Sequence, residues 1–368
     1  MNVPYTRPCL NKDMLNALCH TFNSGWISQG NEVKQFEQEI KAYIGCKHVV
    51  CVSSGTTALM MSYLCVDDFA CIENVITTAS TFIASASPAY VLGFDCDFIE
   101  PCASTGLILP NLINKKLYEM VTDPDIVADT IVIVPVHLGG YGIDINDIEH
   151  DKDKIIEDGC QSFGSAVNNK YIGSESYICC FSFHIGKIIT TGEGGCICTN
   201  SDEVYDWLIK FRNHGLSEHY YVTQLGMNCK MTDLHASIGR LQLKSIDEYK
   251  SHRKQLVKEY NMNLFAMEQL DFLTCPINTT DVAYSLMPVF VHEKTDELQQ
   301  YLKGWGIETR RFFPSMLNQF IFSDEYVICK STVSYVFEEH GLLLPIGNGI
   351  SMIEVQYVCK KIKEFYNA

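Results

Sequence analysis

Seven short runs rich in apolar and β-branched residues, separated by segments with helical periodicity, constrain the fold of this chain most. The runs cover residues 48–53, 74–80, 95–100, 130–138, 154–159, 177–183 and 195–200. Several are apolar without strict alternation, as expected for strands that are covered on both faces. The pattern therefore predicts an α/β domain with a mostly parallel central sheet.

The pattern changes after Thr232, which is a residue type that often caps the N-terminus of a helix. Residues 233–267 read as one long helix or two, and the remainder of the chain mixes strands and helices. A length of 368 residues corresponds to about two domains. We therefore expect a large domain over residues 1–244, including the N-terminal segment, and a smaller domain over residues 245–368.

Charge and composition argue against several classes of partner. The formal net charge is −16 and no basic run is present, so no nucleic-acid partner is expected. The chain has no run of 18 apolar residues and no signal-peptide pattern at its N-terminus, so we expect no membrane span and a cytoplasmic location. The 17 cysteines are scattered without zinc-binding spacing, which favours reduced, mostly buried thiols and no metal site.

Lys187 lies between an apolar strand-like run and a glycine-rich turn, in the stretch FSFHIGKIITTGEGG (181–195). The phosphate-loop pattern G-x-x-x-x-G-K-[ST] does not fit, because its first position is Phe181 and its last is Ile188. We therefore interpret Lys187 as a lysine that is held still for chemistry. A lysine in a dry pocket can lose its proton and form a Schiff base.

Two upstream stretches could assist such a lysine. Residues 54–57 (Ser-Gly-Thr-Thr) place backbone N–H groups and hydroxyls at the start of a predicted helix, which is an anion site. Asp158 ends an apolar strand, at the edge where open α/β sheets bind ligands. Taken alone, the first could be an ordinary helix cap and the second a surface carboxylate.

Lys187, Asp158 and residues 54–57 are more informative when they are considered together, in their order along the chain. A pyridoxal cofactor needs a lysine, a carboxylate for its pyridine nitrogen, an anion site for its phosphate and a flat group against its ring. The chain offers Lys187, Asp158, residues 54–57 and Phe82 for these needs.

This set resembles the DegT/DnrJ/EryC1/StrS family of nucleotide-sugar aminotransferases, which are pyridoxal 5′-phosphate (PLP) enzymes of fold type I. The similarity covers nearly the whole chain, including VSSGTTAL (52–59), TFIASA (81–86), EDGCQSFGS (157–165), the Lys187 stretch and GMNCKMTDLHASIGRLQL (226–243). It implies an α/β fold with a central mixed seven-stranded sheet in the large domain and a smaller C-terminal α/β domain.

The resemblance also implies a role for each matching residue. Lys187 would be the catalytic residue, binding the cofactor covalently and moving protons, and Asp158 would keep the pyridine nitrogen protonated. The other residues expected to bind the cofactor are Gly55, Thr56, Thr57, Phe82, Gln161, Ser182 and Asn228. Asn228 would reach the phosphate from the neighbouring subunit, so a homodimer with shared active sites is expected.

Four residues are expected to contact the substrate: Trp26, His184, His214 and Arg310. Alternatives stay open for the two histidines. His184 could pack beside the cofactor, and His214 could make a local hydrogen bond in a loop. Arg310 is followed by Arg311, where relatives often carry proline.

The implied reaction moves an amino group from L-glutamate to C4 of a nucleotide-linked 4-keto-6-deoxyhexose, through pyridoxamine phosphate. The nucleotide (UDP, dTDP or GDP) and the sugar's stereochemistry are open. The turn KIITTGEGG (187–195) and the segment GWISQG (25–30) resemble relatives that form viosamine- or perosamine-type sugars. Amination at C3 and a non-catalytic PLP-binding regulator are the alternatives. Removal of a sugar hydroxyl is disfavoured, because relatives that do this replace the lysine.

Overall fold

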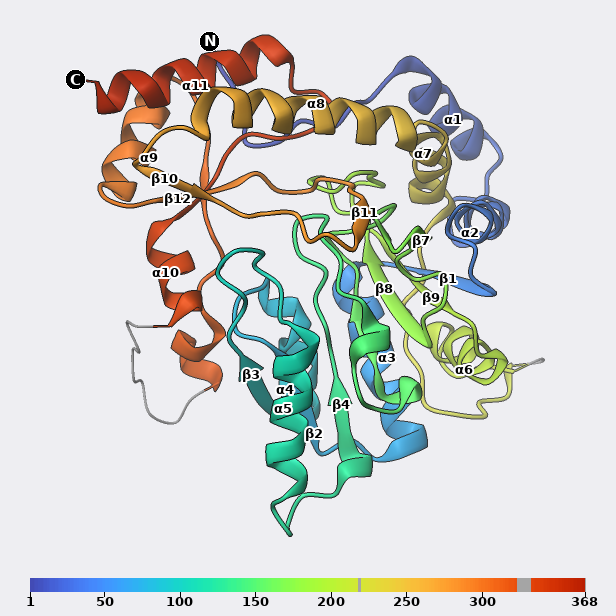
Figure 1. Ribbon diagram of the computed structural model, residues 1–368. Helices are drawn as coiled ribbons and strands as arrows, with labels where there is room; N and C mark the ends of the chain where they lie inside the picture. The colour runs from blue at the N-terminus through green and yellow to red at the C-terminus, as the bar shows by residue number, and fades with distance from the viewer. Residues whose placement is uncertain (218–219, 323–331, 368) are drawn as a thin grey trace.

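The computed structural model describes residues 1–217, 220–322 and 332–367. A central β-sheet with helices packed on its faces forms the larger part of the molecule (Figure 1). A smaller sheet with its own helices lies at the end that carries both chain termini. This arrangement is the α/β architecture that the sequence predicts.

The central sheet contains a strand in each of the seven predicted runs. These strands are β1 (His48–Val52), β2 (Asn74–Thr78), β3 (Asp95–Ile99), β4 (Ile131–Ile133), β5 (Ile156–Asp158), β8 (Ile178–Ser182) and β9 (Gly195–Thr199). Two ladders, β1-β9-β8-β5 and β3-β2-β4, are joined by the parallel bridges Ile133–Ile155 and Val136–Asp158. Within them β9 is antiparallel to both neighbours and the other pairs are parallel. The sheet is therefore mixed.

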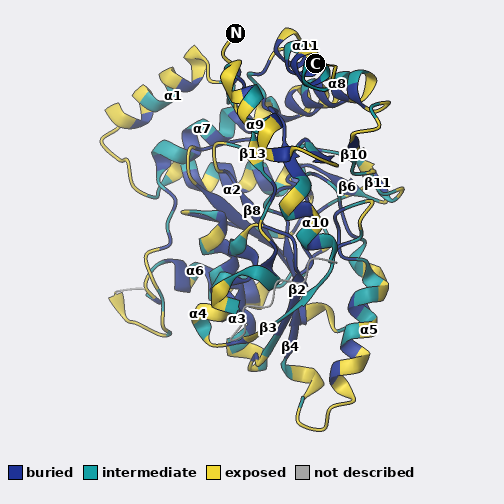
Figure 2. Ribbon diagram, turned by 90° about the vertical axis from the view of Figure 1, so that its left-hand side faces the viewer, coloured by how far each residue is buried: buried dark blue, intermediate teal, exposed yellow. Residues whose placement is uncertain are grey.

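Burial on both faces explains why these strands lack polar alternation. In β8, Cys180 enters the apolar cluster on one face, whereas Phe181 enters the cluster on the other. In β9, Ile197 and Cys196 divide in the same way, since successive side chains point to opposite faces. Strand β8 is dark blue in Figure 2, in contrast to the largely exposed helix α1.

Helices cover the two faces of the sheet. The helices up to residue 244 are α1 (Lys12–Asn23), α2 (Asn31–Ile44), α3 (Gly55–Ala70), α4 (Ser87–Leu92), α5 (Pro110–Val121), α6 (Asp202–Arg212) and α7 (Asp233–Lys244). Helix α3 packs on β8 and β9 from one side. Helices α2 and α7 pack on each other, and their apolar residues join the cluster on the opposite side.

Thr232 caps the next helical region, as predicted, because its hydroxyl accepts the N–H of His235 at 3.4 Å. The region forms two helices, which meet at Ser245: α7 and α8 (Ile246–Leu264). Helix α8 joins two parts of the molecule. Ile246 packs with the central sheet, while Leu256 packs in the C-terminal core.

The C-terminal core surrounds a small antiparallel sheet of order β10-β12-β14-β13. Its strands are β10 (Leu270–Phe272), β12 (Pro288–Val291), β13 (Arg310–Arg311) and β14 (Gly341–Leu343), and its helices are α9 (Thr295–Gly304), α10 (Val333–His340) and α11 (Met352–Tyr366). A further sheet, β11-β6-β7, comprises β6 (Ala166–Val167), β7 (Lys170–Tyr171) and β11 (Thr279–Asp281). Val3 pairs with Ile307, so the N-terminus also packs in this core. The division at residues 244 and 245 stays our proposal.

No helix in the described ranges combines the length and the apolar character that crossing a membrane requires. The described cysteines are unpaired and most are buried.

Candidate active site

A cavity of about 560 Å³ lies where β5 and β8 end. Its lining comes from segments that are distant in the sequence, namely residues 5–6, 54–59, 81–85, 158–161, 182–187, 193, 285–286, 310–314, 343 and 346. Nine of the thirteen predicted site residues line it: Gly55, Thr56, Phe82, Asp158, Gln161, Ser182, His184, Lys187 and Arg310. The fold therefore brings most of the predicted site together within one chain.

Lys187 is held by a turn that folds back on the end of β8. The carbonyl of His184 accepts the N–H of Lys187 at 2.9 Å, and the carbonyl of Phe183 accepts the N–H of Thr191 at 3.0 Å. Gly195 has to be glycine, because a Cβ there would lie 2.6 Å from the carbonyl carbon of Ser54. The glycine-rich stretch thus allows the turn to pack against the start of α3.

Burial lowers the pKa of the Lys187 ammonium below its ordinary value, and the Cys160 thiol and the Asp158 carboxylate partly oppose this effect. The lowered pKa increases the share of neutral amine, which is the form that attacks a carbonyl carbon. Lys187 can therefore act as a nucleophile and as a proton carrier.

Asp158 is a buried carboxylate, 5% exposed, at the C-terminal end of β5. One oxygen accepts the hydroxyl of Ser85 at 2.6 Å, and the other accepts the backbone N–H of Cys160 at 3.0 Å. No lysine, arginine or histidine in the described ranges forms an ion pair with it. A buried carboxylate of this kind can stabilise a cation that enters the cavity.

The N-terminus of α3 forms the anion end of the cavity. Ser54 caps the helix by accepting the N–H of Thr57 at 3.0 Å, and the N–H groups of Gly55 and Thr56 have no acceptor within the described chain. A Cβ at Gly55 would lie 2.7 Å from the Cβ of Ser182, so glycine is required there. Free amides at a helix N-terminus bind phosphate. The Thr57 hydroxyl lies 2.8 Å from that of Ser54, within the cap, and Thr57 does not line the cavity.

Phe82 and Gln161 lie on other walls of the cavity. The Phe82 side chain is 56% exposed, and its ring meets Phe313 edge-on with centroids 6.3 Å apart. The Gln161 carbonyl oxygen accepts the N–H of Gly139 at 3.1 Å, while its amide nitrogen has no acceptor among the described residues. An aromatic face and an amide donor are thus available to a flat polar ligand.

His184 and Arg310 line the cavity as predicted for substrate contacts. Burial lowers the pKa of His184, and its Nε2 lies 3.9 Å from a Glu193 oxygen. The Arg310 guanidinium lies 4.5 Å from the centroid of the Tyr5 ring and makes no ion pair in the described part of the chain. Arg311 donates to the carbonyl of Glu338 at 2.9 Å.

Trp26, His214 and Asn228 lie outside the cavity of this chain, on its surface. The Trp26 indole donates to the carbonyl of Gln29 at 3.0 Å. His214 lines a separate open pocket of about 410 Å³ that also includes Lys230. Their roles stay predictions, and one chain does not bring these residues to Lys187.

Several cavity residues were not predicted from the sequence. Tyr5 and Thr6 come from the N-terminal segment and Cys160 follows Asp158 by two positions. Ser85, which donates to Asp158, lies 73 positions away from it. The sequence offers no local signal for contacts of that separation.

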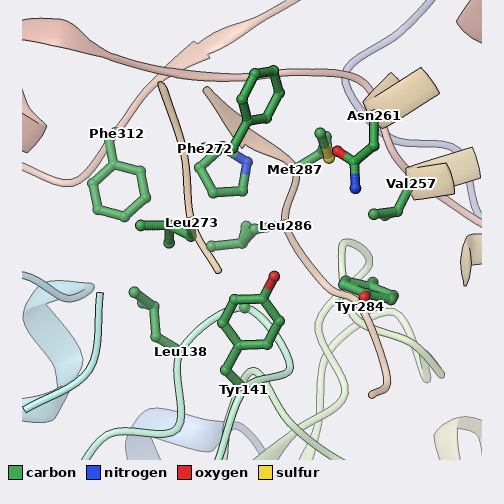
Figure 3. Close-up of a pocket in the computed structure, with 12 residues that line it drawn as sticks. Leu138, Tyr141, Val257, Asn261, Phe272, Leu273, Tyr284, Leu286, Met287 and Phe312 are labelled. Atoms are coloured by element: carbon green, nitrogen blue, oxygen red, sulfur yellow. The ribbon is translucent and has the colours of Figure 1, made fainter. Parts of the chain in front are cut away.

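A second crevice adjoins the cavity, between the loop after β4 and helix α8 (Figure 3). It shares Leu286 and Phe312 with the cavity and is otherwise lined mainly by apolar and aromatic side chains. Its volume of about 30 Å³ is too small for a cofactor. No cluster of three or more His, Cys, Asp or Glu side chains that could hold a metal occurs within the described ranges.

A sequence model of the DegT/DnrJ/EryC1/StrS aminotransferase family matches residues 8–363. The chain belongs to this family. GDP-perosamine synthase of Escherichia coli O157:H7 is 29% identical to this DegT-family chain over 372 residues, covering 99% of both. The solved structure of DesV from S. venezuelae has a TM-score of 0.90 and 26% identity, covering 100% of this chain and 99% of that one. The PLP-form of the putative sugar aminotransferase Spr1654 from Streptococcus pneumoniae has a TM-score of 0.87 and 23% identity, covering 99% and 98% of the chains.

These findings confirm the predicted family, the fold type and the enzyme class. The chain is a sugar aminotransferase of the DegT family, and its cofactor is PLP. The cavity fits this cofactor, because it presents a lysine of lowered pKa, a buried carboxylate with no cationic partner among the described residues, and amides at a helix N-terminus that have no acceptor there.

Proposed function

We propose that this aminotransferase transfers the amino group of L-glutamate to C4 of a nucleotide-linked 4-keto-6-deoxyhexose, producing a 4-amino-4,6-dideoxy sugar nucleotide and 2-oxoglutarate. The observation that carries the proposal is the similarity to GDP-perosamine synthase over 99% of the chain. A second GDP-perosamine synthase, from Vibrio cholerae, is 26% identical over 378 residues. A cytoplasmic location stays a prediction from the sequence.

Each cavity residue has a definite task in this proposal. When bound, PLP supplies an electron sink for the carbon atom that loses or gains a proton. The carboxylate of Asp158 would keep a proton on the pyridine nitrogen, and the N–H groups of Gly55 and Thr56 would bind phosphate oxygens. The neutral amine of Lys187 would take a proton from the donor's α-carbon and deliver one to the sugar carbon that receives nitrogen.

Other residues would orient the cofactor and the substrates. The ring of Phe82 would cover one face of the cofactor, while Gln161 would donate to its ring oxygen and Ser182 to its phosphate. Arg310, which lacks an ion pair among the described side chains, could bind an anionic group of either substrate. His184 could bind a sugar hydroxyl.

We also propose that the active site is completed by a second copy of the chain. Asn228 is exposed, as is Trp26, and several neighbours of Asn228 are large exposed apolar residues, including Tyr221, Leu225 and Met227. An exposed group of such side chains is typical of a protein interface. In a symmetric dimer, each Asn228 would bind phosphate in the partner's cavity.

The position of amination can be tested directly. The pyridoxamine form is incubated with GDP-, dTDP- and UDP-linked 4-keto-6-deoxyhexoses and with 3-keto analogues, and each product is characterised by NMR. We expect nitrogen at C4, a methyl group at C6 and the formation of one equivalent of product. Nitrogen at C3, with the 4-keto sugars refused, would replace this proposal by C3 amination.

A further inference from the structure

Arg253, in the middle of α8, is the largest fully buried side chain in the described structure, at 1% exposure. Its guanidinium donates to three neutral acceptors: the side-chain oxygen of Asn348 at 2.6 Å, the carbonyl of Tyr284 at 3.0 Å and the carbonyl of Lys187 at 2.7 Å. Within the described ranges, no aspartate or glutamate forms an ion pair with it.

A buried cation without a carboxylate partner is costly. Removing such a charge from water costs several kcal/mol, and neutral acceptors offset only part of that cost. The cost of burying the charge is reflected in the titration of the arginine, because burial lowers the pKa of Arg253 to about 10. An apolar side chain of similar volume would fill the same space without this cost, so the charge is a candidate for a functional role.

The contacts of Arg253 lead directly to the catalytic lysine. Its guanidinium holds the Lys187 carbonyl, and its partner Asn348 donates to the next carbonyl, that of Ile188, at 2.8 Å. Two consecutive carbonyls of the lysine turn are thus held by residues from the C-terminal half of the chain. Tyr284, the third partner, lines the crevice of Figure 3 between the two parts of the molecule.

The charges that face Lys187 come from three directions. Asp158 and Cys160, after β5, favour its protonated form, whereas the Arg253 cation on α8 opposes protonation. His184 precedes it in the same turn and interacts with Glu193. Like charges that lie near each other disfavour each other's ionised forms.

We propose that Arg253 is a positioning residue for Lys187: it fixes the main chain of the lysine turn and sets a positive charge against the lysine ammonium. The proposal rests on the role of Lys187 in the proposed function. It assigns Arg253 no contact with the substrate. Its effect passes through the Lys187 carbonyl and through the electric field at the Lys187 amine.

The test measures the titration of Lys187 without using turnover. Full-length protein freed of cofactor is labelled with a trace of acetic anhydride over a pH series, and mass spectrometry gives the pH at which half of Lys187 reacts. Arg253→Met removes the charge, so this midpoint should rise. Arg253→Lys keeps the charge at pH values below the pKa of the new lysine, and over that range labelling of Lys187 should stay near that of the wild type.

Hydrogen exchange tests the second part of the proposal. Both Arg253 variants lose the guanidinium fork, so peptides that cover residues 184–191 should exchange faster than in the wild type. Asn348→Ala is the matched control, because it removes hydrogen bonds to Arg253 and Ile188 without changing the charge. It should lower the thermal midpoint and leave the Lys187 labelling midpoint in place.

A folded Arg253→Met protein that labels like the wild type would overturn the role of the charge, and unchanged exchange over residues 184–191 would overturn the role of the fork. If Arg253→Met does not fold, Asn348→Asp places a carboxylate beside the guanidinium and should also raise the midpoint. An unchanged labelling midpoint in Asn348→Asp would equally contradict the proposed role of the Arg253 charge. Borohydride reduction of wild-type protein with PLP tests the role of Lys187 separately. Attachment of the cofactor to another lysine would contradict the proposed function, but it would not contradict the effect of Arg253 on the labelling midpoint of Lys187.

Discussion

The cavity and the surface around Asn228 differ in how completely one chain builds them. Around the cavity, Asp158 is held by Ser85 and by a backbone amide, and Lys187 lies in a turn that is hydrogen-bonded at several points. Asn228 and Trp26 are exposed and have few contacts. One chain therefore supplies the reacting groups in fixed positions. The groups predicted to reach across an interface would gain their contacts only in a dimer.

The difference suggests where changes should act. Substitutions in the cavity should damage chemistry, because their partners are already in place. Substitutions on the Asn228 surface should damage assembly and cofactor retention, because their partners lie in another chain.

The largest effect is expected at Lys187. Lys187→Ala removes the amine that binds the cofactor and carries protons, so kcat should fall by about 10⁴-fold or more, with loss of the visible absorbance of the lysine-bound cofactor. Lys170→Ala, at an exposed lysine paired with Glu175, is the control and should be fully active. Near-normal turnover of the Lys187 variant would refute the assignment of the cavity as the active site.

Asp158→Asn should have the next largest effect. The neutral amide cannot hold a proton on the pyridine nitrogen, and the loss of such an electrostatic partner costs about 10²-fold or more in kcat. Circular dichroism should show an intact fold, because the amide retains most of the shape of the carboxylate. The exposed Asp206→Asn serves as control. Wild-type kinetics in the Asp158 variant would assign this role to a different carboxylate.

Asn228→Ala tests the contrasting surface. Loss of one hydrogen bond to a phosphate costs about 1.5–3 kcal/mol, so the cofactor should dissociate roughly 10- to 100-fold more readily. Dialysis followed by absorbance measures this retention.

Mixing Lys187→Ala chains with Asn228→Ala chains makes the same comparison sharper. If each site combines residues from two chains, random pairing restores about a quarter of the sites, because half of the dimers are mixed and each of these has one intact site. Activity that does not recover on mixing, or a fully active monomer in light scattering, would show that the cavity is complete in one chain.

The sequence predicted those parts of the molecule whose signals are local. The seven apolar runs form strands, and the apolar residues that indicate each strand lie within the run itself. Thr232 caps the helix that follows it through a hydrogen bond to a residue three positions away. Lys187 was recognisable because the glycines that shape its turn lie beside it.

Contacts between distant segments could not be predicted in this way. Arg253 reaches the Lys187 carbonyl across 66 positions, and its helix shows ordinary amphipathic spacing. Tyr5 lines the cavity, and its segment is held by the pairing of Val3 with Ile307 and by the N–H of Ile346, which donates to the Tyr5 carbonyl at 3.1 Å. Such contacts arise from packing between the two parts of the molecule, which no short motif encodes.

The smallest expected effect concerns one of these distant contacts. Ser85 is buried and donates its hydroxyl to Asp158 at 2.6 Å, so Ser85→Ala removes one of the two hydrogen bonds that fix the carboxylate. The charge of Asp158 remains, and kcat should fall by only about tenfold, equivalent to about 1.4 kcal/mol. Ser62→Ala is a matched control, because Ser62 is equally buried and donates to the carbonyl of Ala58 in α3. It should change the thermal midpoint and leave kcat unchanged. Equal losses of kcat in both variants would indicate a general packing effect, whereas a loss confined to Ser85→Ala would show that the orientation of the carboxylate contributes to the rate separately from its charge.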